Sequence, residues 1–292
     1  MFWAFAAVIT NVVEQLLITK LLFSLDIVVF AMLFYTTSTI IMTVLHLKNH
    51  KTQIADFKYT FGHKFLLLGY VGGSFWGNVL WFISLTLIGV GMAAFILVFV
   101  RVIVTAYSYI YMNDRFSIDK AIAFSIGIIA LLIFSFSNEN VNAFGALLAV
   151  ISCFGFAAEI IFRKKLIEAN VNSDNAIIAR NATLSLLWWS IFAVGCIWGA
   201  YSIESLTEIS SHIFLLLLLT AILGGILGHQ FAFKAMRTIK LSQYESLSAL
   251  KPVLLAIGGI LLFDESITFT QSIAGAVIIV STFYFLRGKK TS

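Results

Sequence analysis

Residues 227–280 read LGHQFAFKAMRTIKLSQYESLSALKPVLLAIGGILLFDESITFTQSIAGAVIIV, in which apolar runs alternate with short polar turns. Most charged side chains fall in the turns, as in KAMRTIK at residues 234–240. A helix of about 20 apolar residues crosses the roughly 30 Å hydrocarbon core of a bilayer. The run from residue 241 to residue 263 reaches that length, so this stretch predicts consecutive transmembrane helices.

The composition extends this prediction to the whole chain. Of the 292 residues, 60% are hydrophobic and only 11% are charged, and the mean hydropathy is +0.99. Soluble domains carry about 25% charged residues. We therefore predict an all-α membrane protein with ten transmembrane helices, and we expect no cleaved signal peptide, because the apolar sequence starts at residue 2 without a basic segment before it. The predicted spans are 2–22, 27–47, 65–88, 90–112, 118–137, 142–163, 175–201, 212–236, 241–263 and 268–286.

Basic residues predict the orientation, because lysine and arginine in short loops mark the cytoplasmic side. They gather in the loop from Lys48 to Lys64, in the sequence RKK at residues 163–165, and near the C-terminus. Lys20 is the one basic residue predicted for the opposite side. We predict that both termini are cytoplasmic and that this multi-pass protein lies in a bacterial plasma (inner) membrane. The basic residues of the cytoplasmic side then account for the net charge of +5, and no nucleic-acid partner is expected.

An internal similarity divides the chain into two five-helix halves, residues 1–138 and 139–292. Glu14 in NVVEQLLITKL aligns with Glu159 in AAEIIFRKKL, and Arg101 aligns with Lys251 near the middle of the fourth and ninth spans. Because five is odd, the second half would be inverted relative to the first. Inverted repeats of this kind are typical of transporters that work by alternating access.

The chain resembles the drug/metabolite transporter superfamily, in its ten-helix form built from two EamA domains. The resemblance is carried by residues 227–280, where a helix ending in Lys and Arg is followed by a small polar turn, a helix containing Pro252, an acidic end and an aliphatic helix. It implies a carrier for amino acids, nucleotide sugars, phosphorylated sugars, choline-like cations or drugs. Many EamA members have an acid before this proline. Lys251 stands there in this chain, and it resembles the lysine of nucleotide-sugar and sugar-phosphate carriers.

Four charged residues inside the predicted spans are the first candidates for a substrate site, because charge in a bilayer is costly and usually functional. Arg101 and Lys251 each lie about 15 Å along their helix and are predicted to bind an anionic group. Glu14 and Glu159 are predicted to bind an ammonium group or to couple transport to protons. In the alternative reading, the two acids only neutralise the two bases.

Uncharged and peripheral residues complete the candidates. Asn78 and His229 are predicted to form hydrogen bonds with the substrate. Trp81 is predicted to lie at the site, and with other tryptophans it would form a cage for an organic cation; those others are Trp76, Trp188 and Trp189.

Three further features have a structural interpretation. Glu245 is predicted to cap the start of the ninth helix. Arg180 is predicted to extend to the cytoplasmic surface. Small residues on the third helix are expected to let another helix approach closely; they are Gly69, Gly72, Gly73 and Gly77.

The sequence therefore predicts a secondary transporter of a small polar metabolite, an amino-acid-like zwitterion or a small organic anion. The alternatives within transport are an organic cation such as choline or S-adenosylmethionine, and a nucleotide or phosphorylated sugar. The alternative from another class is a membrane enzyme or a non-transporting membrane protein. The sequence has no GxSxG, P-loop, HExxH or CxxC motif, so no catalytic residue, cofactor or metal is predicted. The expected partners are the substrate, the lipid bilayer and protons as a candidate coupling ion, and the expected state is a monomer or a homodimer.

Overall fold

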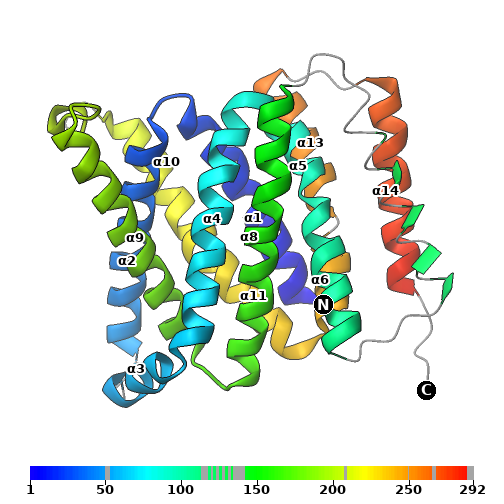
Figure 1. The fold of residues 1–292 in the computed structure, drawn as a ribbon, viewed down its shortest axis with the longest axis horizontal. Coiled ribbons are helices and arrows are strands. Elements are labelled where there is room, and N and C mark those ends of the chain that lie inside the picture. Colours follow the sequence, from blue (N-terminus) through cyan, green and yellow to red (C-terminus); the bar gives the residue numbers. More distant parts are fainter. Residues whose placement is uncertain are drawn as a thin grey trace.

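The structure is a computed structural model, and all of its regular elements are helices (Figure 1). It describes residues 1–49, 53–112, 142–206, 209–248, 250–264 and 268–287, together with a few isolated residues between 118 and 133. No strand occurs in these residues. The prediction of an all-α membrane protein is therefore confirmed.

The described helices follow the predicted spans closely. Eight spans in the described residues, some of them made of two or three consecutive helices, are long and apolar enough to cross a bilayer. A ninth, α14, contains a shorter apolar segment at Ser272–Ser281. The predicted span 118–137 lies largely outside the described residues. The helices of the spans are α1 (Phe2–Leu22), α2 (Ile27–Asn49), α4 (Lys64–Ile88), α5 (Val90–Ile96), α6 (Val98–Tyr111), α8 (Ala143–Glu168), α9 (Ser173–Ile197), α10 (Ser211–Thr220), η2 (Ala221–Gly228), α11 (His229–Thr238), α12 (Leu241–Ser248), α13 (Leu250–Phe263) and α14 (Phe269–Arg287).

Two differences from the predicted spans matter for the site. The helix α8 runs on to Glu168, beyond the predicted end at residue 163, so Arg163 lies inside the helix. The polar loop between α2 and α4 contains a short helix, α3 (Gln53–Gly62), at one end of the bundle (Figure 1).

The outer surface of the bundle is apolar, as a lipid-facing surface must be. Large apolar side chains such as Phe5, Trp76, Leu186 and Ile197 are exposed along the middle of their helices or at their ends. Polar residues instead occur among the buried ones, including three glutamates and three arginines of the spanning helices. This inside-out distribution points to a polar site in the interior.

Helices from the two halves of the chain pack on one another. The helix α4 packs along α8 in the centre of Figure 1, and α2 packs along α9. The helix α1 packs on the span formed by α10, η2 and α11, while α5 packs on α13 and α6 on α12. Each of these contacts joins residues that are far apart in the sequence, so the interior is built from both halves.

The contact between α4 and α8 depends on glycine. A Cβ atom at Gly73 would lie 2.6 Å from the backbone nitrogen of Glu159 and 2.7 Å from the carbonyl oxygen of Gly155. A Cβ at Gly155 would in turn lie 2.5 Å from the backbone nitrogen of Gly77. The two backbones therefore touch, as predicted from the small residues of this helix, and this brings Glu159 next to α4.

Two spans are interrupted near the middle of the bundle. The turn at Leu97 separates α5 from α6, and the π-helix η2 separates α10 from α11. Interruptions of this kind occur often at functional sites, and here Arg101 and His229 each lie within the first turn of the segment that follows.

Candidate functional site

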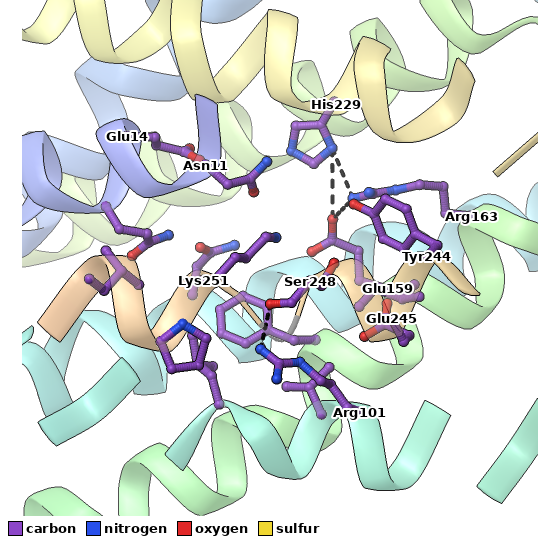
Figure 2. Close-up of a pocket in the computed structure, with 18 of the residues that line it drawn as sticks. Asn11, Glu14, Arg101, Glu159, Arg163, His229, Tyr244, Glu245, Ser248 and Lys251 are labelled. Carbon is purple, nitrogen blue, oxygen red and sulfur yellow. Dashed lines mark hydrogen bonds and ion pairs between the residues drawn. The ribbon is translucent and has the colours of Figure 1, made fainter. Parts of the chain in front are cut away.

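A pocket of about 140 Å³ lies in the interior of the bundle, where the interrupted spans meet (Figure 2). Its walls come from α1, α4, α6, α8, α9, α11, α12 and α13. Four basic and three acidic side chains line it, so the fixed charge is positive by one when the histidine is neutral. The charged lining residues are Glu14, Arg101, Glu159, Arg163, Arg180, Glu245 and Lys251.

One wall of the pocket is a buried ion cluster centred on Glu159. One oxygen of this carboxylate accepts a hydrogen bond from Arg163 on the next turn of α8. The other oxygen lies 3.8 Å from Nη2 of Arg180 on α9. All three side chains are less than 10% exposed. Two arginines therefore balance Glu159, which leaves a net positive charge on this wall.

Aromatic and polar groups fix the two arginines of the cluster. The Arg163 guanidinium lies over the rings of Tyr70 and Phe233, at 5.5 and 5.8 Å. Arg180 donates from Nε to the Ser74 hydroxyl at 2.7 Å and from Nη1 to the Asn181 side chain at 2.8 Å. These contacts hold both side chains in place from more than one direction.

His229 completes this wall. Its Nδ1 lies 2.9 Å from Nη2 of Arg163 and 3.1 Å from the Tyr70 hydroxyl. Because a guanidinium can only donate hydrogen bonds, Nδ1 acts as the acceptor and the imidazole is the neutral tautomer with its proton on Nε2. Figure 2 shows His229 beside Glu159 and Arg163, at the edge of the pocket.

Arg101, Lys251 and Glu245 form the opposite side of the pocket. Arg101 donates a hydrogen bond to the backbone carbonyl of Ser248, at the end of α12. Lys251 lies in the first turn of α13 and is half-buried. Glu245 is 3% exposed and interacts electrostatically with both cations. Within the described residues, none of these three side chains has an ion-pair partner inside 4.0 Å.

The remaining predicted polar residues come from α1 and α4. Glu14 is 9% exposed and lies against Gly224 of η2, where any side chain would overlap its carboxyl group. Asn78 donates to the carbonyl of Ser74 at 2.6 Å, and its side chain lines the pocket. The structure thus brings together six of the seven predicted substrate-site residues, namely Glu14, Asn78, Arg101, Glu159, His229 and Lys251.

The seventh residue, Trp81, is not in the lining. Its indole nitrogen donates to Oε1 of Gln15 at 2.7 Å, so Trp81 lies behind Gln15, which lines the pocket in its place. Trp76 is 61% exposed on the lipid side, and Trp188 packs on Phe75. None of the four tryptophans considered for the alternative of a cation cage lines the pocket.

Two further predictions are corrected by the buried charges. Arg180 was expected to extend to the membrane surface, but it is 3% exposed and lies in the ion cluster. Glu245 was expected to cap a helix, but α12 begins at Leu241 and places Glu245 one turn further along, facing the pocket. Both residues lie within six residues of the start of their predicted spans, 175–201 and 241–263, so their sequence position favoured the membrane surface.

A second, more open cavity of about 400 Å³ lies where the C-terminal ends of α6 and α8 meet the start of α12. It is lined by Lys164, Lys165, Lys240 and two tyrosines, Tyr107 and Tyr111. Within the described residues, no three His, Cys, Asp or Glu side chains gather as metal ligands.

The fold is that of an integral multi-pass membrane protein with a polar interior. Residues 143–287 match the EamA-like transporter family, so the second half of the chain is an EamA-like transporter domain, consistent with the drug/metabolite transporter superfamily. A solved structure titled "Crystal structure of protein" superposes with a TM-score of 0.72 at 14% identity, over 97% of this chain and 94% of that chain. That similarity shows a shared fold. No curated protein matches the sequence.

Proposed function

We propose that this protein carries a small anionic or zwitterionic metabolite across the membrane by alternating access. The observation that carries the proposal is the interior pocket, which is lined from both halves of the chain and has an excess of one positive charge. Glu159 is paired with Arg163 and Arg180. Arg101 and Lys251 are therefore the cations left to bind an anionic group of a substrate.

The size of the pocket favours a small substrate. An engineered protein cavity of about 150 Å³ holds a benzene molecule, and this pocket has a volume of about 140 Å³. Alanine, lactate and succinate are of that order. Nucleotide sugars and S-adenosylmethionine are larger than this space, so the pocket of this structure favours the smaller molecules.

Glu14 gives the pocket a place for an ammonium group. It faces the pocket from α1, on the side away from Arg101 in Figure 2, and no ion pair holds it among the described residues. Of the two acids aligned between the halves, Glu14 is therefore the one available to a ligand, because Glu159 is paired with two arginines. A zwitterion would place its carboxylate at Arg101 and Lys251 and its ammonium group at Glu14.

A binding screen tests the proposal on the purified protein. The panel contains lactate, succinate, sulfate, L-alanine, L-glutamate, glucose 6-phosphate and choline, and the readout is the thermal midpoint of unfolding. We expect a small carboxylate or amino acid to raise the midpoint, because a ligand that binds only the folded state stabilises it. A shift with choline alone would contradict the proposal and favour an organic cation carrier.

The two cations are tested by substitution. A hydrogen bond to a charged group contributes about 1.5–3 kcal/mol, or roughly 10- to 150-fold in affinity. We expect Arg101→Gln and Lys251→Met each to weaken binding of the best panel anion by at least about tenfold. The matched controls are Arg237→Gln and Lys234→Met, since both residues are exposed and lie outside the pocket. Unchanged affinity in both pocket variants would contradict the anion site.

A further inference from the structure

Glu245 is a buried carboxylate with no ion-pair partner among the described residues. It is 3% exposed, and its Oε1 atom has no hydrogen-bond partner. A buried ionised carboxylate is costly unless it is paired and hydrogen-bonded. Glu245 nevertheless lines the pocket directly, which places this unsatisfied oxygen beside the proposed substrate site.

The charges around Glu245 come from several elements. Arg101 on α6, Lys251 on α13 and Arg163 on α8 all attract it electrostatically. Glu14 and His229 line the same pocket from α1 and α11, which also pack against α12. The helix α14 packs there too, but its described residues do not reach the pocket.

These attractions act across space rather than through close ion pairs. Arg101 donates its hydrogen bond to the Ser248 carbonyl, and no nitrogen of Arg101 or Lys251 lies within 4.0 Å of the Glu245 carboxylate in the described part of the chain. Glu159 differs, since two arginines contact it directly. Glu245 can thus exchange its cations for another anion at little cost in broken contacts.

We propose that Glu245 is an exchangeable counter-anion, which balances Arg101 and Lys251 in the empty carrier and takes up a proton from solvent when an anionic substrate group replaces it. The reason is electrostatic. When two anions share one small buried site, one of them binds a proton. The substrate anion takes the two cations, so the proton goes to Glu245, and it returns to solvent when the substrate leaves. One proton then accompanies each anion across the membrane.

This inference rests on the proposed function, because it requires an anionic substrate at Arg101 and Lys251. In this inference the coupled proton binds to Glu245, whereas in coupling through Glu14 it would bind to Glu14. It also assigns Glu245 a role in substrate exchange, in place of the capping role that its sequence position predicted.

Calorimetry in two buffers of different ionisation enthalpy tests the proposal by counting the protons bound with the anion. The probe is succinate or lactate, whichever gives the larger thermal shift in the panel. For the natural protein, we expect about one proton taken up per anion at a pH near neutrality. For Glu245→Gln, we expect no proton uptake, affinity that no longer falls as the pH rises, and binding at least as tight as that of the natural protein.

Glu168 serves as the reference carboxylate. Glu168→Gln removes a half-exposed acid that pairs with Lys164 outside the pocket, and it should keep the proton uptake. Glu14→Gln tests the rival carboxylate of the pocket. Proton uptake that persists in Glu245→Gln, or that is lost in Glu14→Gln instead, would overturn the inference.

The experiment separates failure of this inference from failure of the proposed function. If the natural protein binds no anion of the panel, the proposed function itself is wrong. If it binds an anion and Glu245→Gln leaves the proton count unchanged, only the role of Glu245 is wrong. Should Glu245→Gln not fold, Glu245→Asp replaces it, since it keeps a carboxylate but moves it by one methylene. Proton uptake must then persist with a shifted pH midpoint, and an unshifted midpoint would overturn the inference.

Discussion

Two glutamates with the same predicted role differ in their contacts. Glu159 is paired with Arg163 and Arg180, and the imidazole of His229 lies 3.8 Å from its carboxylate. Glu14 has no such pairing in the described residues and borders the pocket beside Gly224. We therefore interpret Glu159 as the acid that keeps two arginines stable in the interior, and Glu14 as the acid available to a ligand.

The stability of the two Gln variants separates these roles. Removing one partner of a buried ion pair costs about 3–5 kcal/mol, so Glu159→Gln should lower the thermal midpoint of the purified protein strongly. Glu14→Gln should change the stability by less than about 1 kcal/mol, because it breaks no ion pair. Equal midpoints for the two variants would contradict the anchoring role of Glu159.

Ligand binding tests Glu14 with a matched pair of probes. L-alanine and lactate differ mainly in an ammonium group that replaces a hydroxyl. If Glu14 receives the ammonium group, Glu14→Gln should weaken the binding of alanine by about tenfold or more and leave lactate unchanged. Thermal shift titrations measure both affinities. A loss of lactate binding in the same variant would show that Glu14 acts on the pocket as a whole.

The buried charges explain how far sequence could predict this site. Arg101, Lys251, Glu14 and Glu159 stand out because each is a charge inside an apolar run. Arg163 could not be recognised as an interior residue, because it belongs to a basic cluster at the predicted end of a span. The helix α8 continues beyond that end to Glu168, so Arg163 lies within the helix. The side chain of Glu245 faces the pocket because of where α12 starts, and that of Trp81 is set by its hydrogen bond with Gln15. Apolar periodicity predicts neither.

At the scale of elements, the crossing of α4 and α8 offers a test within one helix. Gly73 and Gly72 are neighbours, but a Cβ at Gly73 would meet two backbone atoms of α8, while a Cβ at Gly72 would have nothing within 4 Å. Overpacking of a tight contact typically costs 1–3 kcal/mol, and alanine is otherwise favoured over glycine in a helix. Gly73→Ala should therefore lower the thermal midpoint, and Gly72→Ala should leave it unchanged or raise it slightly. A similar loss in both variants would mean that helix propensity, and not close packing, governs this crossing.

The spans themselves were predictable, since length and apolarity select them. The interruptions of these spans could not be predicted. The turn at Leu97 and the π-helix η2 both lie in continuous apolar sequence. In η2, Gly224 and Gly225 leave room for the side chains of Glu14 and Ser38, so the cause of the local geometry lies on two other helices.

At the scale of the molecule, the predicted inverted repeat implies a definite pattern of helix contacts. Such a repeat pairs α1 with α8, α2 with α9 and α4 with the span from α10 to α11. Under this pairing, the contact of α4 with α8 corresponds to the contact of that span with α1, and the contact of α2 with α9 maps onto itself. Both contacts exist in the bundle. The two halves, residues 1–138 and 139–292, remain a prediction that a solved structure with the opposite opening would test directly.

The orientation in the membrane can be measured on the full chain with single cysteines. The native Cys153 and Cys196 would first be replaced by alanine, and Ser24→Cys and Lys58→Cys then added separately. Ser24 lies in the exposed turn between α1 and α2, and Lys58 is exposed on α3. Because basic residues are retained on the cytoplasmic side, an impermeant maleimide should label Ser24→Cys in intact cells and label Lys58→Cys only after the membrane is opened. The reverse pattern would place both termini outside, and it would then turn the lysine-lined cavity at the ends of α6 and α8 away from the cytoplasm, where the positive-inside rule does not expect it.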